Sequence, residues 1–157
     1  MRDLMQEALD AGAFGVSTGT FYPPASAAPT DEIIDVCRPL KDLRDAGRRG
    51  LYATHLRDEA DHIVPAMEEA LLIGRELDCR VVFSHHKLAG ERNHGRTRET
   101  LDLISRAAAS QPVCLDCHPY PAPSTMLRLD RAEEAALMAE ARRQIAVSYT
   151  HLRAHET

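Results

Sequence analysis

A strand-then-helix unit repeats along this chain, and the repeat predicts an α/β fold built on a parallel sheet. Strands are expected over the runs 13–19, 50–55, 81–86 and 113–120, and polar side chains gather at the carboxyl ends of at least three of them. All strands of a (β/α) barrel contribute to one mouth, so this gathering favours part of a (β/α)8 TIM-like barrel over a doubly wound sheet. About four βα units would form half of such a barrel.

The helices are predicted by apolar residues that recur at helical spacing. They are expected over 1–12, from Thr30 onward, and over 61–77, 98–109 and 131–145. Gly12 is the expected end of the first helix. Thr30 is the expected N-cap of the second, and Pro39 should kink or shorten that helix. The clearest apolar face belongs to the helix over 61–77 and consists of Ile63, Met67, Ala70, Leu71 and Gly74.

Length and composition are those of a single soluble domain. The 157 residues carry a formal net charge of -5, which gives no reason to expect nucleic acid or an anionic membrane as a partner. No apolar run is long enough to span a bilayer, and the acidic, amphipathic N-terminus is unlike a signal peptide, so a cytoplasmic protein is expected. The four cysteines do not form a dense disulfide framework, which fits a reducing compartment.

Two of the predicted strands end in histidine. Alternation along a strand places His85 and Lys87 on the face of Phe83, with His86 on the opposite face. If this face and the face of His55 both point into the barrel, two imidazoles meet at its mouth and would be good ligands for zinc. Lys87 would lie just above them, where its point charge could meet a substrate anion. The alternative is that both histidines are ordinary strand-end residues.

Three further patterns receive a structural interpretation. Cys114 and Cys117 form a C-x-x-C pattern, but residues three apart on a strand point to opposite faces, so both are interpreted as packing residues. The segment Arg57-Asp58-Glu59 could be catalytic, but it is expected instead to cap the following helix and to bind the loop. The basic segment 90–96 contains glycine, but its spacing is not that of a P-loop, so a solvated loop is expected.

Four motifs in a consistent order resemble the D-aminoacylase family, the N-acyl-D-amino-acid deacylases of the amidohydrolase superfamily. The motifs are Gly15-Val16-Ser17-Thr18-Gly19 with Tyr22-Pro23-Pro24, Ala53-Thr54-His55-Leu56-Arg57-Asp58-Glu59, Ser84-His85-His86-Lys87, and residues 116–125. The resemblance implies a (β/α)8 barrel of the metal-dependent hydrolase type beside a small β-domain. It also implies zinc-dependent hydrolysis of an N-acyl-D-amino acid, a small-molecule substrate, to a carboxylate and a free D-amino acid.

The same resemblance implies roles for five residues. His55 and His85 resemble the two histidine ligands of a tightly bound zinc ion. Lys87 resembles a group that binds the substrate α-carboxylate, and Ser124 resembles a further substrate contact. His118 stands where the family usually has a substrate-binding tyrosine, and its imidazole could still donate a hydrogen bond. The family's His-x-His pair and bridging cysteine are expected upstream of this chain, and its catalytic aspartate downstream.

Residues 1–147 are therefore expected to be the central part of an amidohydrolase barrel, inactive or poorly active by itself. Residues 148–157 do not resemble the family and are expected to be a non-native tail, similar to a translated sequencing adapter, so His151 and His155 are excluded from the site. One alternative is a cyclic-amide hydrolase of the hydantoinase or dihydroorotase type, but residues 16–19 lack the lysine that such enzymes usually carry. Another is a non-catalytic α/β binding module.

Overall fold

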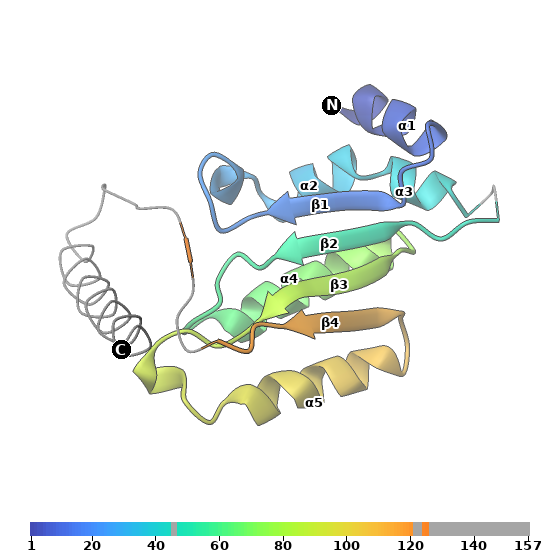
Figure 1. Ribbon diagram of the computed structural model, residues 1–157. Helices are drawn as coiled ribbons and strands as arrows, with labels where there is room; N and C mark the ends of the chain where they lie inside the picture. The colour runs from blue at the N-terminus through green and yellow to red at the C-terminus, as the bar shows by residue number, and fades with distance from the viewer. Residues whose placement is uncertain (45–46, 121–123, 126–157) are drawn as a thin grey trace, which may run out of the picture. The chain divides into compact units, whose positions relative to one another are not determined.

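The computed structural model describes residues 1–44, 47–120 and 124–125 (Figure 1). Contacts within the chain divide it into two units, residues 1–118 and 119–157, and the first contains every helix and strand that is described. The helix expected over 131–145 and the tail expected over 148–157 lie outside the described residues, so both stay predictions.

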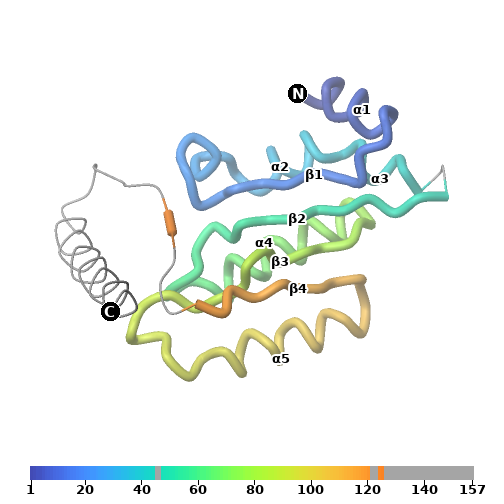
Figure 2. Tube along the Cα trace, viewed as in Figure 1, coloured from blue at the N-terminus to red at the C-terminus, as the bar shows by residue number. Residues whose placement is uncertain are grey.

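Four parallel strands form one sheet, and they are β1 Gly15–Gly19, β2 Leu51–His55, β3 Arg80–His86 and β4 Val113–Cys117. Each strand lies beside the strand that precedes it in the chain, in the order β1-β2-β3-β4 (Figure 2). A doubly wound sheet would reverse this order at a switch point, whereas a (β/α) barrel keeps it. The predicted α/β class, parallel sheet and partial barrel are thus confirmed.

Five α-helices connect or flank these strands in the described part of the chain. They are α1 Arg2–Asp10, α2 Thr30–Val36, α3 Pro39–Asp42, α4 Ile63–Glu76 and α5 Thr97–Ala108, with short 3-10 turns η1 Ala25–Ala27 and η2 Glu91–Asn93. In Figure 1, α4 lies behind β2 and β3, and α5 runs beside β4. Helix α4 therefore covers the middle of the sheet on the side away from the viewer in Figure 1.

Two helix boundaries follow from the residues predicted to set them. Gly12 ends α1 in a conformation with φ of 105°, and the amides of Gly12 and Ala13 donate to the carbonyls of Leu9 and Ala8. Helix α2 stops at Val36, and a separate short helix begins at Pro39. Both predicted boundaries are confirmed.

The predicted N-cap of α2 is wrong. Pro29 occupies the cap position, and Thr30 is the first helical residue. The hydroxyl of Thr30 donates a hydrogen bond of 2.8 Å to Glu69 of α4, whereas an N-cap hydroxyl would accept one from an amide of its own helix. The Thr30 side chain therefore makes a tertiary contact with α4 in place of the local capping contact that the sequence predicted.

The core lies between α4 and one face of the sheet. Tyr52 and Thr54 of β2 lie in register with Val81 and Phe83 of β3, and all four are almost inaccessible to solvent. The predicted apolar face of α4 is buried at every one of its five positions. Its packing is close, since an added Cβ at Gly74 would collide with Val81.

The opposite face of the sheet is more open. Ala53 and His55 on this face are half-buried, and Cys114, in register with Val82, is exposed. Cys117 is exposed as well, so the interpretation of both β4 cysteines as packing residues is wrong. Among the described residues, no helix combines the length and apolar character needed to cross a membrane.

Candidate metal centre

His55 and His85 meet at the carboxyl ends of neighbouring strands. The Nδ1 atom of His55 lies 3.0 Å from the Nε2 atom of His85, and the two ring centroids are 4.5 Å apart. His55 is the last residue of β2, and His85 is the penultimate residue of β3. The structure therefore brings together the two imidazoles that the sequence predicted to converge.

The route by which His85 reaches His55 differs from the prediction. Thr54 and Phe83 are in register on the helix-covered face, so His55 lies on the other face, and regular alternation would leave His85 on the face of Phe83. The β3–β4 ladder instead shifts between Phe83 and His86, and His85 has a positive φ of 41°. This irregularity turns the ring of His85 toward His55.

The same irregularity sends His86 to the helix side. His86 is 6% exposed, and its Nε2 atom lies 2.9 Å from the hydroxyl of Thr100 in α5. Burial lowers the pKa of His86, with an opposing effect of Glu59. The predicted grouping of His85 with Phe83, and of His86 on the opposite face, is therefore wrong, although the meeting of His55 and His85 is right.

Glu59 is the residue that the sequence analysis missed. Its carboxylate oxygens lie 3.5 Å from Nε2 of His55 and 3.1 Å from Nδ1 of His85, and they also form an ion pair with Nζ of Lys87. Only 8% of Glu59 is exposed. The available signal was a carboxylate four residues after a strand-end histidine, on the loop that leaves the barrel mouth.

The two residues before Glu59 stabilise the loops on either side of the cluster. Asp58 accepts hydrogen bonds from the amides of Ala60 and His62 at 2.7 and 3.1 Å, just before α4 begins. Arg57 binds backbone carbonyls of the loop between β1 and α2. Loop binding is thus confirmed for Arg57. The capping prediction is wrong, because His62 is the N-cap of α4 and no described side chain caps that helix end; Asp58 instead stabilises the turn before the helix, and Glu59 lies in the histidine cluster.

Lys87 lies beside the histidines, as expected from its position. Its ammonium contacts Glu59, and it lies 3.0 Å from Nδ1 and 3.3 Å from the carbonyl oxygen of His85. The carboxylate of Glu59 is therefore the anion that Lys87 meets within this chain. Its binding of a substrate carboxylate stays a prediction.

The donor set fits a divalent metal ion. Nε2 of His55 and Oε1 of Glu59 are buried, and among the described residues each lies close to another group of the cluster without forming a hydrogen bond. Burial lowers the pKa of His55, Glu59 opposes this effect, and His85 and Lys87 add to it, so the ring is held in the neutral form that binds metals. The ligand atoms of His55, Glu59 and His85 all lie within 4.8 Å of one another. Two imidazoles and a carboxylate form a ligand set that zinc commonly uses.

Two aromatic rings from the loop after β1 lie against His55. The ring centroids of Phe21 and Tyr22 are 5.3 and 4.9 Å from that of the imidazole. The backbone amide of His85 donates to the carboxylate of Asp116 on β4, which holds the irregular turn of the chain. Residues from three strands therefore shape this cluster.

The two other predicted substrate contacts are His118 and Ser124. His118 is half-buried at the end of the first unit, and its amide donates to the carbonyl of His86 at 3.3 Å. Ser124 is exposed and belongs to the second unit. Substrate binding by His118 and Ser124 stays a prediction.

The sheet order and this histidine–carboxylate cluster define the first unit as a segment of a (β/α) barrel with a metal-type donor set at its mouth. The chain is 84% identical over 137 residues to an N-acyl-D-aspartate deacylase from Alcaligenes xylosoxydans xylosoxydans, covering 87% of this chain and 26% of the relative. It is 60% identical over 131 residues to a D-aminoacylase of the same organism, covering 83% of this chain and 26% of the relative. No family model matches the chain.

Solved structures agree with these relatives. A D-aminoacylase, described as defining a novel subset of amidohydrolases, superposes with a TM-score of 0.75 at 58% identity, over 83% of this chain and 26% of its own. An N-acyl-D-glutamate deacylase from Bordetella bronchiseptica, in complex with zinc and a phosphonate inhibitor, superposes with a TM-score of 0.74 at 44% identity. The superposition covers 84% of this chain and 27% of that structure's chain. The chain resembles the D-aminoacylase group of amidohydrolases in sequence and in fold, as its motifs predicted, and it spans about a quarter of the length of the relatives that it matches.

Proposed function

We propose that this chain supplies part of the active site of a zinc-dependent N-acyl-D-amino-acid deacylase. The observation that carries the proposal is the convergence of His55, His85 and Glu59, with buried atoms of two of them left without a hydrogen-bond partner in the described structure. The high identity to an N-acyl-D-aspartate deacylase supports an N-acyl-D-aspartate as the substrate. Residues 1–147 form the central part of the barrel, and the general base comes from outside this chain.

The chemistry follows from the donor set. A zinc ion at this position would lower the pKa of a water molecule and polarise the scissile carbonyl. His55 and His85 present nitrogen lone pairs at the mouth, and Glu59 holds the ammonium of Lys87 beside them. Lys87 binds the α-carboxylate of the substrate as a point charge, which orients the amide and lets the configuration at the α-carbon decide which substrates react. His118 and Ser124 add further substrate contacts.

Metal stoichiometry tests the site directly. The purified chain is equilibrated with zinc and dialysed, and the metal is quantified in the unchanged chain, in the double variant His55→Gln with His85→Gln, and in His94→Gln. His94 is an exposed histidine and serves as the matched control. The unchanged chain and the control should retain about one zinc ion per molecule at this site, and the double variant should lose it. Equal zinc content in all three would refute the metal site.

Activity requires the remaining part of a barrel. The 137 residues of this chain that align with the N-acyl-D-aspartate deacylase replace the matching quarter of that enzyme. The assay measures release of D-aspartate from N-acetyl-D-aspartate by this chimera. The chimera should hydrolyse this substrate in the presence of zinc, and the double histidine variant should not. The isolated chain should have little or no activity. An active double variant would refute the proposed function.

A further inference from the structure

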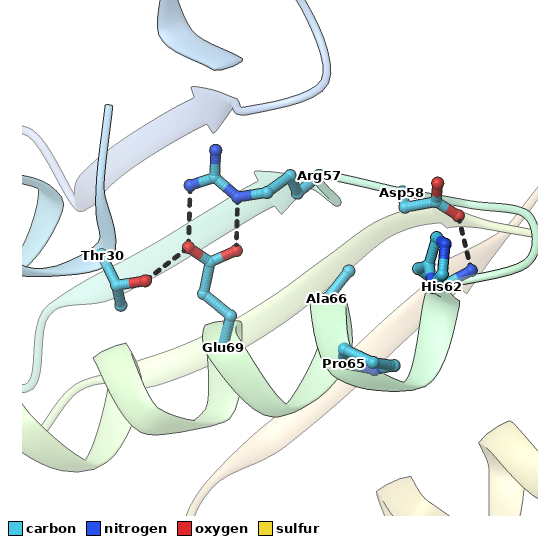
Figure 3. A pocket seen from close by; sticks show the side chains of 7 residues that line it. All are labelled: Thr30, Arg57, Asp58, His62, Pro65, Ala66 and Glu69. Carbon is cyan, nitrogen blue, oxygen red and sulfur yellow. Dashed lines mark hydrogen bonds and ion pairs between the residues drawn. The ribbon is translucent and has the colours of Figure 1, made fainter. Parts of the chain in front are cut away.

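Arg57, two residues after His55, ties three separate segments together. Its Nε and one Nη atom donate to the two oxygens of Glu69 in α4, each at 2.8 Å, which is a bidentate pair (Figure 3). The guanidinium also donates to the carbonyl oxygens of Ser26 and Ala28, both at 2.9 Å. Glu69 accepts a further hydrogen bond from the hydroxyl of Thr30, as Figure 3 shows. One side chain thus fastens the loop between β1 and α2 to the middle of α4.

This arrangement uses properties that only arginine has. A planar guanidinium can satisfy a carboxylate in bidentate fashion and still direct donors to two carbonyls, whereas a lysine ammonium cannot present this fork. Burial by itself raises the pKa of Glu69, but the hydrogen bonds from Arg57 and Thr30 outweigh it and hold that pKa below its ordinary value. The pair is therefore ionised on both sides at neutral pH, and its hydrogen bonds are of the strong, charge-assisted kind.

The fastened loop leads directly to the metal centre. The amide of Ser26 donates to the carbonyl of Tyr22 at 2.8 Å, and the ring of Tyr22 lies 4.9 Å from that of His55. Phe21 adds a second ring at 5.3 Å. At the start of the loop, the hydroxyl of Thr20 donates to the carbonyl of His55 at 3.1 Å. A continuous series of contacts therefore joins Glu69 on the outer helix to the imidazole at the barrel mouth.

We propose that Arg57 is a positioning residue for the metal centre. Its fork with Glu69 fixes the segment 20–28, and this segment holds Phe21 and Tyr22 against His55 so that the imidazole keeps one orientation. The role of the orientation rests on the proposed function, in which His55 is a metal ligand. The contacts themselves do not depend on any metal, so they can be tested in the metal-free chain.

The test uses the full 157-residue chain, labelled with nitrogen-15, as the unchanged protein and as Arg57→Lys and Glu69→Gln. Arg49→Lys is the matched control. Arg49 also pairs with a carboxylate, that of Asp78, but it precedes the first residue of β2, whereas His55 is the last residue of that strand. Amide hydrogen exchange is followed at three reporters inside the loop, whose amides donate to loop carbonyls at 2.8–3.1 Å: Ser26, Ala27 and Ala28. The proton resonances of the His55 ring are followed at the same time, since the adjacent aromatic rings shift them.

Both loop variants should exchange the three reporter amides about tenfold faster than the unchanged chain, while amides within β2 and β3 keep their protection. The His55 ring resonances should move in both variants and stay in place in Arg49→Lys. Arg57→Lys keeps the positive charge, so faster exchange of the loop amides in this variant would show that the forked guanidinium itself is required.

Three results would overturn the proposal. The first is unchanged exchange at the reporter amides. The second is faster exchange with unmoved His55 resonances, because Arg57 would then order the loop without acting on the site. The third is loss of protection throughout the sheet in both variants, because Arg57 would then support the whole fold. A zinc titration of the unchanged chain is a separate arm: absence of binding would refute the proposed function, and the metal-free measurements would still decide the role of Arg57.

Discussion

Helix α4 packs against β3 through Gly74, and the replacement Gly74→Ala tests how closely the two elements approach. A Cβ at position 74 would lie 2.2 Å from Cγ2 of Val81. Val81 is fully buried, and a β-branched side chain has little freedom to rotate away. The added methyl group must therefore push the helix from the strand or force Val81 off its rotamer.

The expected size of the effect combines two opposing contributions. Overpacking of a filled core costs about 1–3 kcal/mol. Alanine in place of glycine inside a helix stabilises by about 1 kcal/mol, because the unfolded chain loses conformational freedom. Gly74→Ala should therefore lower the free energy of unfolding by up to about 2 kcal/mol. In a Val81→Ala background, where Cγ2 is absent, the same replacement should be neutral or stabilising.

Urea unfolding followed by far-ultraviolet circular dichroism measures these differences, since the chain contains no tryptophan. Gly19→Ala is a matched control, because its Cβ would meet Tyr22 at an ordinary 3.6 Å. A double-mutant cycle gives the coupling between positions 74 and 81. The reasoning would be refuted by an equal destabilisation from Gly74→Ala in both backgrounds, or by stabilisation in the unchanged one.

Three other predictions concern charged groups and thiols. Glu59→Gln should weaken zinc binding about 10–100-fold in a chelator competition, with the exposed Glu99→Gln as control. Glu69→Gln should weaken the attachment of the loop 20–28 to α4 by about 1–2 kcal/mol at pH 7, measured as faster exchange of the loop amides. The pKa of Glu69 is lowered from 4.5, so its contribution is present above that pH, and the difference in loop exchange between the variant and the unchanged chain should shrink as the pH falls through the lower folded value. A thiol reagent should modify the exposed Cys114 and Cys117 rapidly. It should modify the buried Cys37 and Cys79 only on unfolding, because burial raises the pKa of their thiols to about 11 and about 12, respectively. Equal modification rates at all four thiols would contradict the last prediction.

Local patterns account for the parts of the fold that were predicted correctly. The apolar period of α4, the break at Pro39 and the glycine end of α1 depend on residues within a few positions of one another. The sequential strand order also follows from local information, because regular strand–helix repeats with polar strand ends favour a barrel. The N-cap of α2 could not be predicted in this way, because Thr30 bonds to a residue of α4 that is 39 positions away.

Residue patterns were sufficient to predict the class of the fold, the resemblance to D-aminoacylases and the convergence of two histidines. The way in which these histidines converge, and the groups around them, depend on contacts between distant parts of the chain. Alternation assumes a regular strand, but the turn at His85 depends on a ladder shift against β4 and on a hydrogen bond to Asp116, which lies 31 residues further along. Glu59 enters the site for a related reason: a loop carboxylate is directed inward by the groups that pair with it, and two of these groups, His85 and Lys87, lie at the end of β3 and just after it.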